Sequence, residues 1–385
     1  MRVVGLLAAL IGATTLVVAI VVGALGASPA RGLTAGLSSL TPEAPVVAVA
    51  GTDVIDRRSG EPLQLVGANW PGFEYACIQG RAHNDGGDDA AAIAAMVEWG
   101  FTAVRLPLNQ QCWFDERPGI AFATGAEYRA SVRDWVMRLT EAGLVVILDL
   151  HWSAPSPALA DGLRPMPDAD STRFWSSVAI DYRKHQGVLF DVFNEPHSRF
   201  DPDRGEWAFT LEWQCWAAGG CSPPLENDQT FPLTGQTYTA VGMAELVDAV
   251  RESRATQPII LSGIDYANDL RGWIEAAPDD GQLIAGLHAY PGNRCADEAC
   301  WNTEVAPLAE HVPVVMAEFG QSDGGDDYLR RAFAWADGTI SGALAWAWWS
   351  IPTSESPTNA AFSLVTDEYA PRSPSGTTLV ELVQR

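Results

Sequence analysis

Two glutamates, Glu195 and Glu318, each follow a short apolar run of the kind that forms a buried strand. Charged residues are rare at such positions unless they are paired or functional. Two carboxyl groups facing each other across a cleft can cleave a glycosidic bond, because one protonates the departing sugar oxygen while the other, ionised, attacks the anomeric carbon. Their surroundings must then hold the two pKa values apart.

Further residues at predicted strand ends suit the same chemistry. Arg105 carries a fixed positive charge that would keep a neighbouring carboxylate ionised, and Tyr290 can donate a hydrogen bond to the same group. Asn194 can bond the sugar 2-hydroxyl, a contact that strengthens as positive charge develops on the ring. Trp349 offers a flat face beneath a sugar. We expect Trp346 and Trp348, in contrast, to pack in the core.

The remaining candidates are two histidines and two tryptophans. His151 and His288 stand at the ends of two other strands, and Asp149 is interpreted as a structural residue behind the site that could orient His151. Trp70 and Trp152 are additional candidates for contact with substrate. The histidines could also bind zinc with a carboxylate, but they lie on different strands and lack HExxH spacing. No Gly-x-Ser-x-Gly elbow of a serine hydrolase is present, and we expect no metal and no cofactor.

Alternating strand-like and helix-like segments predict the elements that hold these residues. The predicted strands are Leu63–Asn69, Phe101–Pro107, Leu144–Leu150, Val188–Phe193, Pro258–Ser262, Leu283–His288, Pro313–Phe319 and Gly342–Trp349. The predicted helices are Ala90–Trp99, Tyr128–Ala142, Arg173–His185, Tyr238–Arg254, Leu270–Ala276, Thr303–His311, Asp326–Ala336 and Thr378–Val383. Eight such units have the size and rhythm of an α/β fold of the (β/α)8 TIM barrel class.

Three details complete the predicted barrel. A hairpin of Val46–Val49 and Thr52–Ile55 precedes it. The stretch His197–Gln236, after the fourth strand, is too long for a plain connector and is predicted to be an elaborated loop on the functional face. An open doubly wound sheet is the alternative, but the place of its phosphate loop, Asn69–Phe73, contains no GxGxxG.

The chain begins with a targeting signal. Arg2 precedes an uncharged run, Val3–Ala27, followed by small residues. We therefore interpret residues 1–30 as a secretory signal peptide or a membrane anchor, with possible membrane attachment through residues 3–27. Residues 31–45 form a spacer and 46–385 the catalytic domain. Either reading predicts an extracellular protein, secreted or anchored to the outer face of the cell membrane.

Six cysteines agree with an oxidising destination. Proximity in sequence suggests that Cys215 pairs with Cys221 and Cys295 with Cys300, which leaves Cys77 for Cys112. Six cysteines allow about fifteen pairings, so the sequence alone leaves the others open. A metal site is the competing interpretation, but no CxxC with partner histidine spacing appears.

The charge of the chain restricts its partners. Among 385 residues, Lys and Arg number 24 and Asp and Glu number 48, a net charge of −24. Such a chain repels phosphate, so we expect no nucleic-acid partner. A neutral sugar polymer is unaffected by this field, and the 15 Trp include enough to stack on sugars as well as to fill a core.

The sequence resembles glycoside hydrolase family 5, the large cellulase family. The run Val188–His197, which reads VLFDVFNEPH, is similar to the family's acid/base signature, and Gly67–Glu74, GANWPGFE, is similar to the first barrel strand of bacterial endoglucanases. The resemblance extends from Val46 to Arg385. It implies a retaining mechanism, with Glu195 as acid/base and Glu318 as nucleophile. The supporting residues that it implies are Arg105, His151, Asn194, His288, Tyr290 and Trp349.

The resemblance implies an exported endo-β-1,4-glucanase whose partner is a β-glucan polysaccharide or oligosaccharide. Family members also cleave mannan and mixed-linkage glucans, so a β-mannanase or a mixed-linkage β-glucanase remains an alternative. A transglycosylase would use the same intermediate with a sugar as acceptor. A non-enzymatic glucan-binding surface protein is a further alternative, which the intact pair Glu195 and Glu318 disfavours.

Overall fold

The computed structural model describes residues 43–85, 90–114 and 125–385. The predicted leader, residues 1–30, and most of the predicted spacer lie outside the described residues. None of the helices within the described ranges is long and apolar enough to cross a membrane.

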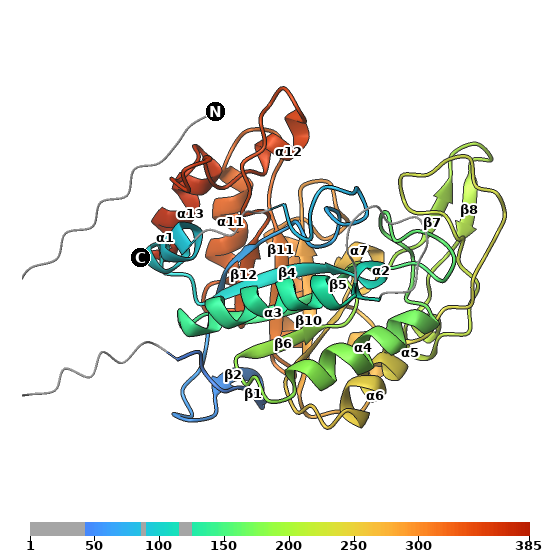
Figure 1. Cartoon of the computed structure of the whole chain (residues 1–385), viewed down its shortest axis with the longest axis horizontal. Helices are drawn as coiled ribbons and strands as arrows, with labels where there is room; N and C mark the ends of the chain where they lie inside the picture. Colours follow the sequence, from blue (N-terminus) through green and yellow to red (C-terminus); the bar gives the residue numbers. More distant parts are fainter. Residues whose placement is uncertain (1–42, 86–89, 115–124) are drawn as a thin grey trace, which may run out of the picture. The chain divides into compact units, whose positions relative to one another are not determined.

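Eight parallel strands close into a barrel, which confirms the predicted (β/α)8 fold (Figure 1). Around the barrel the strands follow one another in chain order, and the last pairs with the first. Short apolar segments form these strands because both of their faces are buried. The barrel strands are β3 (Leu65–Asn69), β4 (Ala103–Asn109), β5 (Val145–Trp152), β6 (Val188–Asp191), β9 (Ile259–Ser262), β10 (Leu283–Ala289), β11 (Val314–Phe319) and β12 (Gly342–Ala345).

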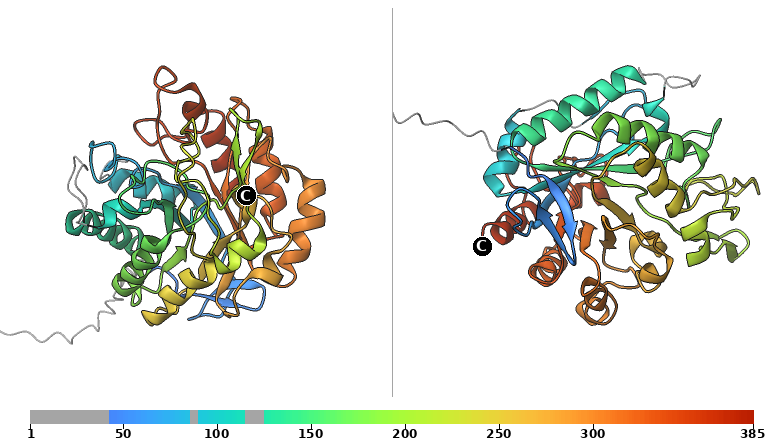
Figure 2. Two further views of the ribbon diagram at one scale, coloured as in Figure 1. Left: turned by 90° about the vertical axis from the view of Figure 1, so that its right-hand side faces the viewer. Right: turned by 90° about the horizontal axis from the view of Figure 1, so that it is seen from below.

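Helices lie around the outside of the strands (Figure 2). The main ones are α1 (Ala90–Trp99), α3 (Ala126–Glu141), α4 (Ala169–Tyr182), α6 (Met243–Glu252), α11 (Asp327–Ala336) and α13 (Ser375–Val383). Shorter ones are α2 (Gln110–Trp113), α5 (Trp213–Ala218), α7 (Ile264–Ala267), α8 (Trp273–Ala276), α9 (Glu298–Cys300), the π-helix η1 (Trp301–Val305), α10 (Ala306–Ala309) and α12 (Pro357–Ala361). The predicted helices Leu270–Ala276 and Thr303–His311 overlap α8 and the pair η1 and α10, whereas the other short segments complete too few turns for an apolar period to reveal them.

The barrel interior has an apolar floor and a polar upper layer. The floor cluster is closed from below by the predicted hairpin, β1 (Val47–Ala50) with β2 (Asp53–Asp56), through Val47 and Val54. Its barrel members are Leu65, Ala103, Val145, Ile147, Leu189, Ile260, Ile284, Val315, Ala317 and Leu344. Because side chains alternate along a strand, further inward positions follow at every second residue. Arg105, Asp149 and Asp191 are the next inward residues on their strands, Asn69 and His288 follow one step later, and all five are buried.

The segment His197–Gln236 is the elaborated connection that its length predicted. It contains the antiparallel pair β7 (Arg199–Asp201) and β8 (Glu206–Phe209), which stands at the right-hand edge of Figure 1, and α5. The irregular backbone that leads into this connection starts earlier than predicted, because β6 ends at Asp191 rather than at Phe193. The last barrel strand is also shorter than predicted and ends at Ala345 rather than at Trp349.

The three disulfides are the pairs suggested by proximity. Their Cα atoms are 6.4 Å apart in Cys77–Cys112, 5.8 Å in Cys215–Cys221 and 5.3 Å in Cys295–Cys300. All six cysteines lie in segments that follow the carboxyl end of a barrel strand. The disulfides therefore hold the loops at the mouth of the barrel.

Candidate active site

Glu318 points into the barrel because β11 is irregular. Simple alternation from Val315 and Ala317, both in the floor cluster, would turn Glu318 outward. The register of β11 shifts against both neighbouring strands at this point, and such a bulge re-aims a side chain. Glu318 is 4% exposed, its Oε1 accepts a hydrogen bond from Arg105 Nη1 at 2.6 Å, and its Oε2 accepts one from the Tyr290 hydroxyl at 2.7 Å.

Glu195 lies in the irregular segment after β6, four positions beyond its last residue. The backbone N–H of Asn194 donates to Leu150 O of the neighbouring strand, which extends the strand-like path to the site. His288 Nδ1 lies 2.8 Å from Glu195 Oε1. Burial raises the pKa of Glu195 to about 7, which keeps it protonated in mildly acidic solution.

The two glutamates share one small space. Carboxylate oxygens of Glu195 and Glu318 and a ring nitrogen of His288 all lie within 4.8 Å of one another. His288 is fully buried between the two glutamates, and its Nδ1 is also 3.6 Å from Glu318 Oε2. Burial lowers the pKa of His288 to about 3, so its imidazole is neutral near pH 7. The arrangement therefore brings a carboxyl group with a raised pKa close to a carboxyl group that is paired with arginine.

Arg105 organises the polar layer of the barrel. Its guanidinium is fully buried and donates to Glu318, Asn69 Oδ1 at 2.9 Å, Asn194 Oδ1 at 2.8 Å and Asp191 Oδ2 at 3.0 Å. The Asn194 amide is thereby oriented, and its Nδ2 is buried with no hydrogen-bond partner among the described residues. A donor left in this way is available to a ligand hydroxyl group.

His151 connects this polar layer to the surface. Its Nδ1 lies 2.7 Å from Asp149 Oδ2, as expected for an orienting carboxyl group. The Trp346 ring stacks on the other side of the imidazole, with ring centroids 5.5 Å apart and planes inclined by 10°. Burial lowers the pKa of His151 to about 4, so the ring is neutral near pH 7.

A cavity of about 980 Å³ opens beside His151 at the mouth of the barrel. Its walls come from the end of β5 and the segments after β3 and β12, and they include His151, Trp152, Tyr75 and Trp346. Neither glutamate lines the cavity. His151 does, and its contact with Asp149, which in turn contacts Arg105, connects the cavity to the polar layer that holds the glutamates. A hollow of this size with aromatic walls and a few polar groups accommodates an oligosaccharide-sized ligand.

The tryptophans divide between this cavity and the core. Trp349 is half-buried and lines the cavity, whereas Trp348 borders the cavity but is 1% exposed and packs against Trp99 with ring centroids 4.7 Å apart, so its predicted core position is confirmed. The expectation that Trp346 is a core residue is wrong, because its half-buried ring lines the cavity. β12 ends one residue before Trp346, so the following backbone leaves the strand and turns this ring toward the mouth.

The two additional tryptophan candidates differ in exposure. Trp152 is half-buried, lines the cavity and lies 6.4 Å from Tyr75, ring centre to ring centre. Trp70 also borders the cavity but is 1% exposed and packs edge-on against Trp135. Trp70 is therefore mainly a packing residue.

Two residues near the site had no role in the sequence interpretation. Glu74 lines the cavity at 2% exposure, its Oε2 accepts from Gly72 N at 2.7 Å, and burial raises its pKa to about 8. Tyr266 stacks on His197 at 4.3 Å and donates its backbone N–H to Pro196 O, next to Glu195. Glu74 lies in the segment that follows the first barrel strand, so its position after a strand was a usable signal; Tyr266 sits in a left-handed turn (φ 58°) that no motif marks.

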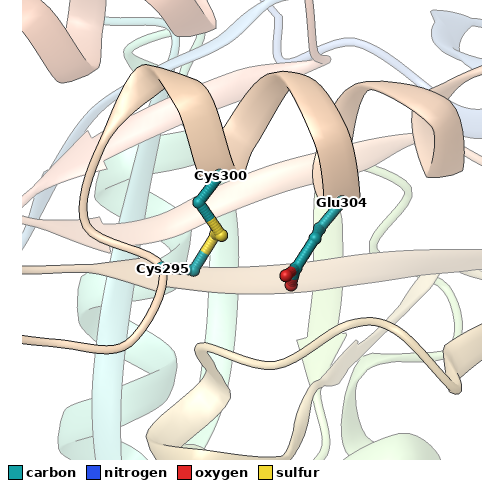
Figure 3. A group of neighbouring side chains, drawn as sticks. All are labelled: Cys295, Cys300 and Glu304. Carbon is teal, nitrogen blue, oxygen red and sulfur yellow. A yellow bond between two sulfur atoms is a disulfide. The ribbon is translucent and has the colours of Figure 1, made fainter.

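Among the described residues, two groups bring metal-ligand atoms together. In the first, Cys295, Cys300 and Glu304 (Figure 3), the sulfurs form a disulfide and Glu304 is paired with Arg294 at 2.7 Å. The second is the Glu195, His288 and Glu318 group. There Arg105, 2.6 Å from Glu318, places a positive charge where a cation would have to bind. Neither group suits a resident metal ion.

Solved structures share this fold at low sequence identity. A β-glucanase from Saccharophagus degradans matches with a TM-score of 0.63 at 16% identity, over 88% of this chain and 92% of that one. A hyperthermophilic endocellulase from Pyrococcus horikoshii matches with a TM-score of 0.60 at 17% identity, over 89% and 100%. Endoglucanase Cel5A from Thermobifida fusca, an E355Q variant in complex with cellotetraose, matches with a TM-score of 0.56 at 17% identity, over 88% and 97%.

The family comparison covers most of the barrel. The model of the cellulase family, glycosyl hydrolase family 5, matches residues 57–355. That range includes all eight barrel strands and both glutamates. The protein is therefore a glycoside hydrolase of the cellulase type and belongs to glycosyl hydrolase family 5.

Proposed function

We propose that the protein is a retaining endo-β-1,4-glucanase. The observation that carries this proposal is the spacing of the two glutamates, whose oxygens lie within 4.8 Å. Retaining glycosidases hold their carboxyl groups about 5–5.5 Å apart, whereas inverting ones need about 6.5–9.5 Å to admit a water molecule. The pair in this barrel supports direct attack by one carboxylate.

The surroundings assign different roles to the two glutamates. Arg105 and Tyr290 hold Glu318 as an ionised carboxylate that attacks the anomeric carbon. Glu195, protonated because it is buried, gives its proton to the departing sugar oxygen. After the covalent glycosyl-enzyme has formed, Glu195 is ionised and takes a proton from the water that releases the sugar.

The cavity supports the choice of substrate. It is lined from β12, β3 and β5, and β12 is next to β11, which carries Glu318, so we infer that it holds the sugars that remain bound to Glu318. Stacking on Trp346 and Trp349 suits the flat faces of pyranose rings. The unpartnered Asn194 amide is positioned to hydrogen-bond a hydroxyl group of the sugar at the reaction centre.

A comparison of substrates tests this proposal. The protein is incubated with carboxymethylcellulose, mannan, lichenan and xyloglucan, and initial rates of reducing-sugar release are compared. We expect the highest rate on carboxymethylcellulose, with an early fall in viscosity that marks internal cleavage. A highest rate on mannan or lichenan would assign the same chemistry to a different glycan. Oligosaccharides longer than the starting material would identify transglycosylation, and binding without sugar release would contradict catalysis.

We also propose that the protein acts outside the cell. The three disulfides at the barrel mouth support this, since structural disulfides persist in oxidising compartments. Residues 1–30 supply the export signal in this proposal. Expression in a secreting host followed by N-terminal sequencing of the protein in the medium and in the membrane fraction distinguishes cleavage of the leader from anchoring.

A further inference from the structure

Two different carboxyl groups meet at one edge of the Arg105 guanidinium. Arg105 Nε donates to Asp191 Oδ2 at 3.0 Å, and Nη2 lies 3.1 Å from Asp149 Oδ1. The Nε and Nη2 groups form one side of the planar fork, which a single carboxylate ordinarily fills with both of its oxygens. In this barrel each aspartate contributes one oxygen, so the two carboxyl groups are drawn close together.

The strand register produces the same proximity. Asp149 of β5 and Asp191 of β6 are direct partners in the parallel pairing, and neighbouring strands lie about 4.8 Å apart. Both side chains are 0% exposed. Asp149 Oδ1 and Asp191 Oδ1 have no aligned hydrogen-bond partner among the described residues. Two buried carboxyl groups on directly paired strand positions, each with an oxygen that lacks an aligned hydrogen bond, cannot both stay ionised without a large cost.

The charges around the pair also fail to balance. Arg105 is the single cation in contact with Asp149, Asp191 and Glu318 within the part of the chain that the structure describes. The other titratable groups that face the pair are acidic or neutral. They are Glu318 from β11, His151 from β5, Glu195 after β6 and Glu74 after β3.

We propose that Asp149 and Asp191 share one proton at neutral pH. The pair then carries one negative charge, a hydrogen bond joins its two carboxyl groups, and the charge of Arg105 is not outweighed at Glu318. Both aspartates are positioning residues that act through Arg105. This inference rests on the proposed function, because it concerns how the nucleophile is kept ionised.

The surroundings of the aspartates agree with a bound proton. Burial raises the pKa of both groups, and Arg105 opposes that rise without cancelling it. Shared protons of this kind arise wherever like charges lie about 3 Å apart in a protein interior.

Asparagine variants determine how many protons the pair holds, because an asparagine amide has the shape of a carboxylic acid but carries no charge. The acid limb of the kcat/KM profile, which reports the nucleophile in the free enzyme, is measured for Asp149→Asn, Asp191→Asn and the double variant. With one shared proton, each single variant keeps one negative charge, so its acid limb stays in place although kcat falls. The double variant loses that charge, and its acid limb moves down by about one pH unit or more.

Two results overturn the proposal. A downward shift in each single variant means that both aspartates are ionised in the native protein. No shift in any variant, the double one included, means that both are protonated. Thermal unfolding of each variant shows that the profile belongs to folded protein.

A measurement without substrate keeps this inference separate from the proposed function. In a Glu74→Gln/Glu195→Gln protein, the two other carboxyl groups whose pKa is raised to about 7 or higher are absent, and infrared spectroscopy at neutral pH reports any remaining buried carboxylic acid. We expect a carbonyl band that disappears when Asp191→Asn is added, because Asp149 is then ionised. No band at the start, or a band that survives Asp191→Asn, contradicts a shared proton. If the protein hydrolyses no glycan, this spectrum still decides the question.

Discussion

Arg105 and Glu318 form a fully enclosed ion pair, with Nη1 and Oε1 2.6 Å apart. They come from β4 and β11, which are not neighbours in the barrel, so the contact crosses its interior. A buried ion pair of this kind adds little to stability, because desolvation offsets the attraction. The pair places a permanent positive charge beside Glu318, whereas burial raises the pKa values of Glu195 and Glu74.

Glu318→Gln removes the proposed nucleophile but keeps the shape of the side chain; the amide oxygen can still accept from Arg105, and the amide nitrogen can donate to the Tyr290 hydroxyl. We expect kcat on an aryl β-cellobioside to fall on the order of 10⁴-fold, with an unchanged fold. The matched control is Glu304→Gln, which alters a glutamate paired with Arg294 outside the site. Normal turnover by the Glu318→Gln protein would show that another group attacks the sugar.

Glu195→Ala removes the proposed acid/base and leaves a small space beside the sugar. We expect added azide to restore turnover of a substrate with an activated leaving group, because azide replaces the activated water and the departing group needs no proton. The product is then a glycosyl azide of retained configuration, which NMR identifies. A folded Glu195→Ala protein without azide rescue argues against this role.

The pH profile reports the protonation of Glu195. Its pKa is raised by burial to about 7, and the first step needs the protonated form. We therefore expect kcat/KM to decline as the pH rises through about 7. Neither neighbouring histidine causes this decline of kcat/KM, since the pKa of His151 is lowered to about 4 and that of His288 to about 3. An activated substrate that needs no acid in the first step should lack this decline; if it declines equally, a different group titrates.

Trp346 and Trp348 are two positions apart and should respond oppositely to alanine. Trp346→Ala removes a ring that stacks on His151 and lines the cavity, so we expect kcat/KM on cellotetraose to fall about tenfold or more with little loss of stability. Trp348→Ala empties a core position and should cost about 3–5 kcal/mol of unfolding free energy. Kinetics and thermal unfolding of both variants, with Trp349→Ala as the second cavity residue, check this contrast.

Glu74 makes the stability of the protein depend on pH. Its pKa rises from 4.5 in the unfolded chain to about 8 in the folded protein, because it is buried. Below pH 4.5 both states hold the proton; between pH 4.5 and 8 only the folded state does, so stability falls as pH rises through this window. Glu74→Gln removes this term and should raise the unfolding free energy by a few kcal/mol above about pH 8. Chemical denaturation at low and high pH measures this difference, and an equal effect at both would contradict it.

The sequence predicts the fold well because its signals are local. Eight apolar runs with helices between them suffice for a barrel, and disulfide partners five or six positions apart need no knowledge of the fold. Cys77 and Cys112 were paired as the remaining cysteines, and the closeness of the segments after β3 and β4 accounts for that pair.

The site is harder to predict where the backbone departs from regularity. Alternation along β11 would point Glu318 away from the barrel, and only the shifted register brings it to Arg105. Similarly, the predicted strand through Trp349 gave no reason to turn Trp346 toward the cavity, because β12 ends earlier than its apolar sequence suggests. The sequence also does not show which polar side chains are buried. Glu74 has the sequence context of an exposed loop carboxylate, although the structure buries it.

The two ends of the barrel are held together by different means. Packing against β1 and β2 closes the floor, whereas the described disulfides all lie among the loops on the other side. A covalent tie keeps a loop in place whatever residues surround it, so the groove-lining positions between the ties are free to vary. Substitutions at these positions can therefore change which sugar polymer is preferred without disturbing the packing at the floor of the barrel.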